Sequence, residues 1–476
     1  MYNAYITRIK NLHKHPNADR LQIGECFGNA VIVSIEYEDN QLGIYFPSDG
    51  QLSVEFAEVN NLLRKKDENG NNIGGYMDAD KRNVTAIKLR GEKSDGLFLP
   101  LTSLESFGDI TTLHEGDRID IFNGHEICCK YIPRTQNKSG HVTDGNKTRK
   151  KKAPVAPLFT EHADTEQLAY NLGAFKAGDE IEITLKMHGT SQRTGYLPVL
   201  KGYKKTLCDR ILRRDGKPIY DWGYVSGTRR TVLEDFDGGY YGSNEFREAH
   251  SKFFEGKLNK GEEIFYEVVG FTHTGAPIMS SCDNKKLNDK DFVKQYGDTT
   301  VFSYGCEPLG TKMTYGNDEQ GSFALPIDVS QSDIYVYRMT MTNEDGFVVE
   351  YTPDFMRYRC EQMGVKCVPT FWKGLVPKKH YAAPSAEDLE MGYLNGGELP
   401  IGEWVKEKAE QYYEGPDPIG KTHIREGVVV RIVNRPKFCA YKHKNWFFKA
   451  LEGIIKVEAE TPDMEEAESV VEDDTE

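Results

Sequence analysis

Short apolar runs separated by Asn, Asp and Gly fill the first 132 residues of the chain, and they limit what this part can fold into. The run at 30–35 reads Ala-Val-Ile-Val-Ser-Ile, and the run at 42–46 reads Leu-Gly-Ile-Tyr-Phe. Short runs rich in Val, Ile and aromatic residues, bounded by turn formers, are typical of β-strands. The pattern therefore predicts a small all-β module of the barrel type over residues 1–132.

The rest of the chain is too long for one further core of ordinary size. A protein of 476 residues and 54.0 kDa is expected to contain two or three domains of about 150 residues each. Residues 133–157 are polar and basic, include Pro154 and Pro157, and lack hydrophobic periodicity, so they are predicted to be a flexible linker. A mixed region of strands and helices is predicted over 158–456, and a disordered acidic tail over 457–476.

Within the mixed region, the period of the apolar residues changes from segment to segment. Segments 262–270 and 334–339 predict strands, whereas 354–364 predicts a helix that ends at Gly364. The sequence as a whole therefore indicates an α+β protein.

Net charge excludes one class of function and leaves others open. The formal charge is −14 and the pI is near 5.5, which argues against a protein that coats nucleic acid through bulk positive charge. The charge is unevenly distributed, because 147–152 is a basic block while the tail is acidic. Local binding of phosphate groups therefore remains compatible with the sequence.

The chain lacks the signals of a membrane or secreted protein. No stretch of about 18 apolar residues occurs, and the first residues do not form a secretory signal. Its nine cysteines show no zinc-type spacing, so reduced thiols are expected. We therefore expect a soluble, intracellular, cytoplasmic protein, and a monomer.

One lysine stands where a nucleophile could act. Lys186 follows the alternating stretch 181–185 and begins the run Lys-Met-His-Gly-Thr. At the end of a half-buried strand its amine can point into a cleft, and the nearby Gly189 allows a phosphate to approach the backbone. Such an amine could attack a nucleotide α-phosphate once it has lost its proton. The alternative is a surface lysine before a turn.

Two strand segments each carry an acid beside apolar residues. Glu267 lies among apolar residues at 266–270, where an unpartnered acid would be costly, although strand alternation also allows it to face solvent. Glu426 begins the run Glu-Gly-Val-Val-Val-Arg, which combines an acid, a glycine and a buried strand. Mg²⁺ takes oxygen ligands and needs only one or two carboxylates when substrate phosphates complete its shell.

Basic and aromatic residues are further candidates for the functional site. Lys442 and Lys444 alternate on one strand and would face the same phosphates, unless the strand is simply solvated. Arg229 is the first choice for a bidentate phosphate contact and Arg230 the second, because the register is open. Alternation puts Tyr335 and Tyr337 on the same face of a strand, so the sequence alone does not separate them from each other or from ordinary core tyrosines.

Together these segments resemble a known family. Residues 15–21 and 88–97 resemble the OB-type module that binds tRNA in certain synthetase subunits, and the chain from about residue 159 resembles the adenylyltransferase domain of ATP-dependent RNA ligases. The order of the two parts is similar to that in the Deinococcus-type family. The resemblance implies an N-terminal OB-type β-barrel, followed by a nucleotidyltransferase domain of antiparallel sheets with flanking helices.

The resemblance also implies roles for individual residues. It makes Lys186 the catalytic residue that holds AMP through a phosphoramidate, and Glu426 and Glu267 the metal-site residues. ATP and Mg²⁺ would be required, with Mn²⁺ as a substitute. The residues implied to bind ATP or AMP are His188, Gly189, Arg193, Arg229, Glu267, Tyr337, Glu426, Lys442 and Lys444.

The implied activity is sealing of RNA in three phosphoryl transfers, at nicks with an RNA 3′-hydroxyl strand and in RNA repair. RNA ends are the expected partner, with further RNA contacts from the N-terminal module. His188 stands where DNA ligases and capping enzymes carry Asp, which favours the RNA-sealing branch. The alternatives are one of those other covalent nucleotidyltransferases, or a non-catalytic RNA-binding protein.

Overall fold

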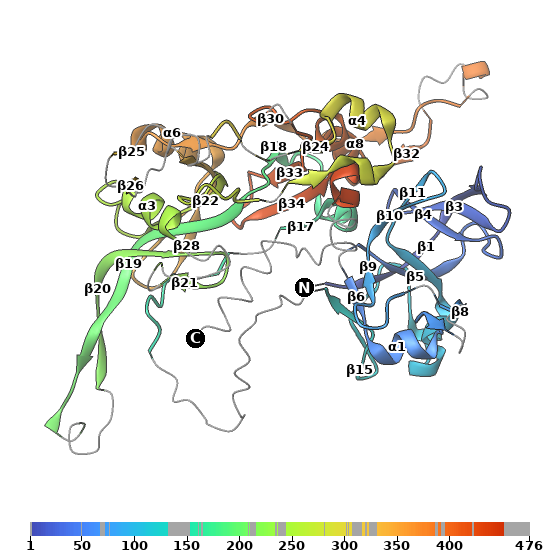
Figure 1. The fold of residues 1–476 in the computed structure, drawn as a ribbon, viewed down its shortest axis with the longest axis horizontal. Coiled ribbons are helices and arrows are strands. Elements are labelled where there is room, and N and C mark those ends of the chain that lie inside the picture. Colours follow the sequence, from blue (N-terminus) through green and yellow to red (C-terminus); the bar gives the residue numbers. More distant parts are fainter. Residues whose placement is uncertain are drawn as a thin grey trace. The chain divides into compact units, whose positions relative to one another are not determined.

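The computed structural model consists mostly of β-sheets, with few helices (Figure 1). It describes residues 2–131 apart from 49, 67–71 and 76. It also describes residues 153–451 apart from 160, 163–164, 208, 210–215, 234–235, 237–243, 280, 301, 303, 307–316, 319–320, 323–330, 386–388, 392–395 and 421–422. Most of the predicted basic linker and the predicted acidic tail lie outside these residues.

The chain divides into two compact units. Unit 1 comprises Met1–Arg134, Lys285–Asp289 and Trp446–Pro462, and unit 2 comprises Thr135–Asn284, Lys290–Asn445 and Asp463–Glu476. The chain therefore returns to the N-terminal unit after the second one, a return that no sequence pattern had indicated.

Unit 1 is built from several small antiparallel sheets. They are β12-β5-β1-β13 (Leu97–Pro100, Leu42–Phe46, Ala4–Arg8, Arg118–Ile119), β2-β3-β4 (Lys10–Lys14, Leu21–Cys26, Asn29–Ser34), β16-β6-β9 (Cys128–Lys130, Gly50–Leu52, Asn83–Val84), β10-β11 (Ala86–Leu89, Glu92–Asp95), β14-β15 (Ile121–Phe122, His125–Glu126) and β7-β8 (Lys65–Lys66, Asn72–Gly74). The predicted strands at 30–35 and 42–46 are confirmed as β4 and β5. Among the described strands these sheets do not close into a barrel, so the OB-type barrel stays a prediction.

An apolar core joins the sheets β12-β5-β1-β13, β16-β6-β9 and β14-β15 of unit 1. Its members include Ile6, Ile44, Phe46 and Leu52, all fully buried. Helix α1 (Val54–Val59) adds Phe56, and its first turn is capped by the Ser53 hydroxyl. Strands β1 and β5 are buried on both faces over most of their length.

The two segments that resemble a tRNA-binding module lie against each other. His15 Nε2 is 3.2 Å from the Leu89 carbonyl oxygen, and Asn17 donates through its side-chain amide to the Arg90 carbonyl at 2.9 Å. Residues 15–21 and 88–97 therefore form one surface of unit 1.

The returning segment 446–451 is helical and is fixed to unit 1 by a buried ion pair. Lys449 Nζ lies 2.6 Å from Asp95 Oδ2, and the Ser48 hydroxyl donates to the other carboxylate oxygen at 2.5 Å. Lys93 Nζ lies 4.6 Å from the centre of the Trp446 ring. Because the Asp95 side chain is only 3% exposed, it requires such a partner.

Unit 2 contains two larger sheets (Figure 1). The first is β17-β34-β33-β18-β30 (Glu166–Gln167, Cys439–Lys444, Gly427–Ile432, Glu180–Lys186, Thr370–Leu375). The second is β21-β20-β19-β22-β27-β28 (Val232–Leu233, Lys217–Gly227, Thr190–Lys204, Glu262–Gly270, Ser332–Thr342, Val348–Glu350), with β29 (Lys366–Cys367) beside β27. Strands β22 and β27 confirm the predicted strands at 262–270 and 334–339.

Helices cover these sheets. Helix α8 (Ile401–Tyr413) packs Val405 and Ala409 against Val428 and Val430 of the first sheet. The remaining α-helices with assigned bounds in the described part of unit 2 are α3 (Glu245–Phe253), α4 (Lys290–Tyr296) and α6 (Pro353–Met363). Among the described helices, none combines the length and the apolar character needed to cross a membrane.

The helix predicted at 354–364 is confirmed as α6. The Thr352 hydroxyl accepts a hydrogen bond from the Phe355 amide, Pro353 occupies the first turn, and Gly364 ends the helix with φ of 75°. These are the residue types that begin and end helices, since proline lacks the amide hydrogen and glycine adopts positive φ without strain.

We predict that Lys449→Met destabilises unit 1. The change leaves Asp95 buried with Ser48 as its remaining side-chain partner, so the free energy of unfolding should fall by about 3 kcal/mol, as measured by urea denaturation. Lys10→Met on the exposed strand β2 is the control and should change it by less than about 0.5 kcal/mol. Equal effects of the two substitutions would contradict the role of the ion pair.

Candidate active site

Three neighbouring strands bring together residues that are far apart in the sequence. Lys186 is the last residue of β18 and lies opposite Gly427, the first residue of β33. Gly427 in turn lies opposite Lys444, the last residue of β34. Glu426 immediately precedes Gly427. Pairing of the strands therefore collects an acid and two lysines at one edge of the sheet.

Glycine is required at position 427 because β33 and β34 lie very close together there. Its φ is 149°, and a Cβ atom added to it would lie 2.1 Å from the carbonyl oxygen of His443. Any side chain would force β33 away from β34. The glycine after the acid is thus explained by packing between the strands.

The Glu426 carboxylate is the electrostatic centre of the cluster. Lys186 Nζ lies 2.7 Å and Lys444 Nζ 3.2 Å from its Oε1, while His188 Nδ1 lies 3.6 Å from its Oε2. Burial alone raises the pKa of Glu426, but the charges of Lys186 and Lys444 outweigh burial and hold this pKa well below its usual range. The carboxylate is therefore ionised at neutral pH.

A pocket opens beside this cluster. It encloses about 970 Å³, including the open space at its mouth. It is lined by His162, Thr165, Glu182, Thr184, Leu185, Lys186, Met187, Ser191, Arg229, Glu267, Tyr337, Met356, Arg357, Val368, Val429, Arg431, Phe438, Ala440 and Lys442. Five of the residues singled out in the sequence are among them, and the pocket combines cations, carboxylates and apolar surface.

A β-bulge decides between the two candidate tyrosines. Phe265 pairs with Arg338 and Tyr266 with Val336, so Tyr337 is the additional residue between them. The bulge breaks the alternation that would have put Tyr335 and Tyr337 on one face. Tyr337 lines the pocket, where its hydroxyl lies 2.9 Å from that of Ser191.

His162 is a pocket residue that sequence reasoning missed. Its ring lies 5.4 Å from that of Tyr337 and 5.1 Å from that of Phe265, and Arg338 donates to its Nδ1 at 3.0 Å. Burial, reinforced by the Arg338 charge, lowers its pKa well below the usual value. The ring is therefore neutral at pH 7. No motif surrounds His162 in the sequence, so no signal could have revealed it.

The two arginines after β20 have different environments. Arg229 lines the pocket, and its carbonyl oxygen accepts from the His162 amide at 3.0 Å. Arg230 is exposed and is not a lining residue. The geometry thus agrees with Arg229 as the first choice for a phosphate contact.

Arg193 occupies a different place from the one expected. Its guanidinium is buried over the ring of Phe159 at 3.7 Å, and it donates to the Thr228 carbonyl at 2.9 Å and to Glu263 at 3.2 Å. It is not among the residues that line the pocket. These contacts join β19, β20 and β22, which is a structural role; a contact with nucleotide or RNA phosphate stays a prediction.

The remaining predicted residues lie in or next to the pocket. Glu267 is 7% exposed and lines it, so its side chain does not face solvent as the alternative had it. Gly189 packs against β22, because a Cβ atom there would lie 2.5 Å from the Val268 carbonyl oxygen. The rings of His188 and Phe302 meet edge-on, with their centres 4.4 Å apart. The backbone amide of His188 donates a hydrogen bond to the Tyr304 hydroxyl.

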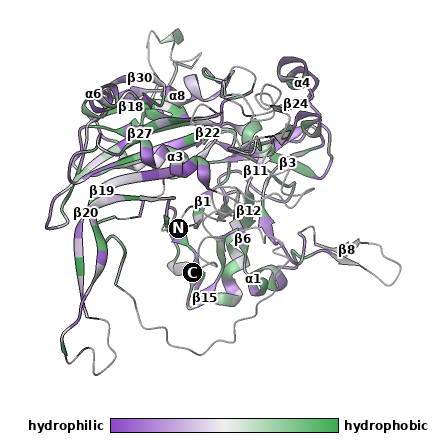
Figure 2. Cartoon of the chain, turned by 60° about the vertical axis from the view of Figure 1, so that its left-hand side comes forward, coloured by the Kyte–Doolittle hydropathy of each residue, from purple (hydrophilic) through white to green (hydrophobic). Residues whose placement is uncertain are grey.

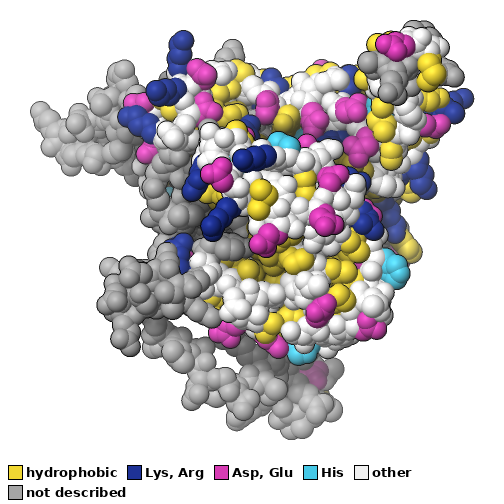
Figure 3. Space-filling view, turned by 90° about the vertical axis from the view of Figure 1, so that its right-hand side faces the viewer, with side chains coloured by type: hydrophobic (Ala, Val, Ile, Leu, Met, Phe, Trp, Pro, Cys, Tyr) yellow, Lys and Arg dark blue, Asp and Glu magenta, His cyan; other side chains and the backbone are white. Residues whose placement is uncertain are grey.

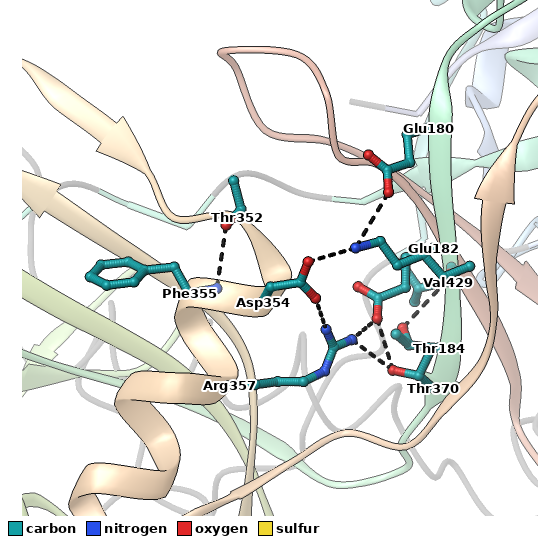
Figure 4. Close-up of polar contacts among 10 residues, drawn as sticks. Glu180, Glu182, Thr184, Thr352, Asp354, Phe355, Arg357, Thr370 and Val429 are labelled. Atoms are coloured by element: carbon teal, nitrogen blue, oxygen red, sulfur yellow. Dashed lines mark hydrogen bonds and ion pairs between the residues drawn. The ribbon is translucent and has the colours of Figure 1, made fainter.

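A second polar cluster borders the pocket (Figure 4). Glu182, from β18, is ion-paired with Arg357 of α6 and accepts a hydrogen bond from the Thr370 hydroxyl at 2.8 Å. Arg357 also contacts Asp354 at 3.0 Å. Glu182 and Arg357 both line the pocket but were not predicted, because neither stands in a recognisable motif.

The described residues contain no cluster of three or more His, Cys, Asp or Glu side chains placed to hold a metal ion by themselves. Glu426 and Glu267 offer one carboxylate each. A metal ion here would therefore depend on oxygen atoms of a bound ligand, as Mg²⁺ commonly does.

Comparison with known proteins finds a distant structural similarity. No protein-family model and no curated protein matches the chain. The chain is similar to solved structures of the RNA ligase of Naegleria gruberi. The structure with pyrophosphate has 14% sequence identity and a TM-score of 0.49, and the match covers 96% of this chain and 99% of that chain. The structure with ATP and Mn has 15% sequence identity and a TM-score of 0.48, and the match covers 94% of this chain and 97% of that chain.

We predict that Glu263 makes stability depend on pH. Burial raises its pKa from 4.5 to about 7 despite the Arg193 charge. The folded state then binds more protons than the unfolded state between these values, so the free energy of unfolding should fall as pH rises from 4.5 to 7, by up to about 1.4 kcal/mol per pH unit. Urea denaturation at several pH values measures the slope.

Glu263→Gln should remove the contribution of Glu263 to the change of the unfolding free energy with pH, because the amide does not titrate. Glu361→Gln, on helix α6, is the control and should keep the slope of the unchanged protein. A slope unaltered by Glu263→Gln would contradict the prediction.

Proposed function

We propose that the protein is an ATP-dependent RNA ligase that forms a lysyl-AMP intermediate on Lys186, transfers AMP to a 5′-phosphate end and seals that end to a 3′-hydroxyl. The observation that carries the proposal is the position of Lys186 Nζ, 2.7 Å from buried Glu426 and at the border of a pocket lined by Lys442, Arg229 and Tyr337. This arrangement offers a nucleophile, phosphate-binding cations and a stacking surface in one place.

In the first step, the Lys186 nitrogen forms a bond to the α-phosphorus of ATP while the bond to pyrophosphate breaks. The nitrogen must first lose a proton, which passes to solvent or to the departing pyrophosphate. Glu426 Oε1, 2.7 Å away, orients the amine but is too weak a base to take the proton, because its pKa is held well below its usual range. Lys186 thus becomes neutral when it reacts.

The cations of the site stabilise the charge that builds up on the phosphate oxygens. Lys442 and Arg229 line the pocket, and Lys444 lies on the same sheet edge, 3.2 Å from Glu426. Transition states of phosphoryl transfer spread negative charge over the nonbridging oxygens, so fixed cations aimed at them supply much of the catalysis.

Mg²⁺, for which Mn²⁺ would substitute, would supply further positive charge at the phosphates when bound. Glu426 and Glu267 would hold it, since each presents a carboxylate at the site. This donor set fits a hard cation that completes its shell with water and phosphate oxygens.

The later steps need RNA ends, and their assignment rests on sequence resemblance. The proposed substrate is a nick with an RNA 3′-hydroxyl strand, in RNA repair, with additional RNA contacts by unit 1. Membership of the Deinococcus-type family is part of the same proposal. A DNA ligase or a capping enzyme would prefer DNA ends or GTP, and a non-catalytic RNA-binding protein would not release pyrophosphate from ATP.

We predict that Lys186→Ala abolishes the covalent adduct, because no other side chain takes the place of the nucleophile. Mixing the protein with radiolabelled ATP and Mg²⁺ and counting label after denaturing electrophoresis measures it. Lys252→Ala, on the exposed side of helix α3, is the matched control and should keep full labelling. Undiminished labelling of Lys186→Ala would falsify the assignment.

We predict that Tyr337→Ala weakens ATP binding, because the pocket loses an aromatic ring on which the base can stack. Stacking of about 1–3 kcal/mol corresponds to an increase in the dissociation constant of about 5- to 150-fold, measurable by calorimetry with Lys186→Ala as the background to prevent turnover. Tyr337→Phe keeps the ring and should bind nearly as well as the unchanged protein. Weak binding by both variants would instead point to the hydroxyl group.

A further inference from the structure

The hairpin formed by β19 and β20 carries a concentration of positive charge in an acidic protein. Among the described residues between 201 and 217 there are four Lys and one Asp, a net charge of +3, whereas the whole chain carries −14. By contrast, Lys, Arg, Asp and Glu are interspersed on the face shown in Figure 3. The hairpin is therefore the natural place for an anionic partner.

The hairpin extends as an arm beyond the sheet to which it belongs (Figure 1). Its strands are paired from Arg193 and Gly227 at the root to Lys204 and Lys217 at the far end. The eleven residues Lys217–Gly227 of β20, at about 3.3 Å each, make this ladder roughly 35 Å long. At about 3.4 Å per nucleotide, the arm matches approximately ten nucleotides of a strand.

The lysines of the arm are placed in a way that an anion would stabilise. Lys201, Lys204 and Lys217 are exposed, and Lys204 lies directly opposite Lys217 in the register. Like charges directly opposite each other across a β-ladder are destabilising. A row of phosphates would relieve this repulsion, which is a specific reason to expect a polyanion here.

Hydrophobic positions are interspersed with hydrophilic ones along β19 and β20 (Figure 2), and aromatic side chains lie on these strands. Tyr196 and Tyr224 stack on each other with ring centres 4.6 Å apart, and Trp222 lies next to them with Lys260 Nζ 5.3 Å from its ring. Ile219 is 46% exposed. Interleaved cations and aromatic rings suit a nucleic acid, which offers both phosphates and bases, better than they suit an acidic peptide.

The root of the arm reaches the pocket that contains Lys186. Ser191, near the start of β19, and Arg229, two residues after β20, both line that pocket. A polymer lying along the arm would therefore lead towards the reacting end.

We propose that the β19–β20 hairpin binds the phosphate backbone of the RNA that flanks the end being joined, over about ten nucleotides. This inference rests on the proposed function for its choice of RNA. It adds a second contact with the substrate, outside the nucleotide pocket, that fixes the direction in which the RNA approaches Lys186.

The test compares two triple charge reversals that change the net charge equally. The arm variant is Lys201→Glu, Lys204→Glu and Lys217→Glu. The control is Lys290→Glu, Lys294→Glu and Lys378→Glu, which changes exposed lysines outside the arm. Binding of a fluorescent, nicked RNA duplex with a 5′-phosphate is followed by anisotropy over a range of salt concentrations, and the enzyme–AMP adduct is measured in parallel.

We expect the arm variant to bind the duplex about tenfold or more weakly at low salt, with a salt slope reduced by about three, one for each lysine. Its adduct formation with ATP should remain at the level of the unchanged protein, because that step needs no RNA. In the control variant, affinity and slope should stay close to those of the unchanged protein. Shortening the flanking duplex below about ten base pairs should remove the difference between the variants.

Equal binding of RNA by the two triple variants would overturn the proposal. Loss of binding to poly-glutamate with RNA binding intact would also overturn it, and would assign the arm to an acidic protein. If the unchanged protein forms no adduct with ATP, the proposed ligase activity fails, whereas the comparison of RNA binding still decides the role of the arm.

Discussion

The ion pairs of Glu426 with Lys186 and Lys444 are the interaction on which the site depends. Two ammonium groups at one sheet edge would repel each other, and a carboxylate buried to 3% exposure would be unstable alone. The Glu426 carboxylate offsets the repulsion between Lys186 and Lys444, and the two lysines stabilise the buried carboxylate. One carboxylate and two ammonium groups leave the cluster with one net positive charge, which would attract an anionic ligand.

The backbone of the first sheet of unit 2 enforces this arrangement. Lys186, Gly427 and Lys444 stand in one row across β18, β33 and β34 because their registers are fixed by the buried side chains Ile183, Val428 and Val430. A shift of one residue would turn these apolar side chains out of the core. The position of the reacting amine is thus determined by the same packing that makes the sheet stable.

Sequence reasoning succeeded where local pattern determines structure and failed where tertiary contacts do. The strands at 262–270 and 334–339 and the helix at 354–364 follow from periodicity and end signals. The face of Tyr337 does not, because the bulge arises from pairing with β22. Nor does the burial of Arg193, whose acidic partner comes from another strand.

Under the proposed function, the ion pair with Glu426 would keep the site inactive until a nucleotide is bound. Without ligand, the negative charge of Glu426 favours the ammonium form of Lys186, which cannot attack phosphorus. The phosphates of ATP would provide Lys444 and Lys442 with other anions, and a metal ion would compete for the carboxylate. In the proposed reaction both changes would weaken the hold of Glu426 on the Lys186 proton, so the substrate itself would complete the activation of the nucleophile.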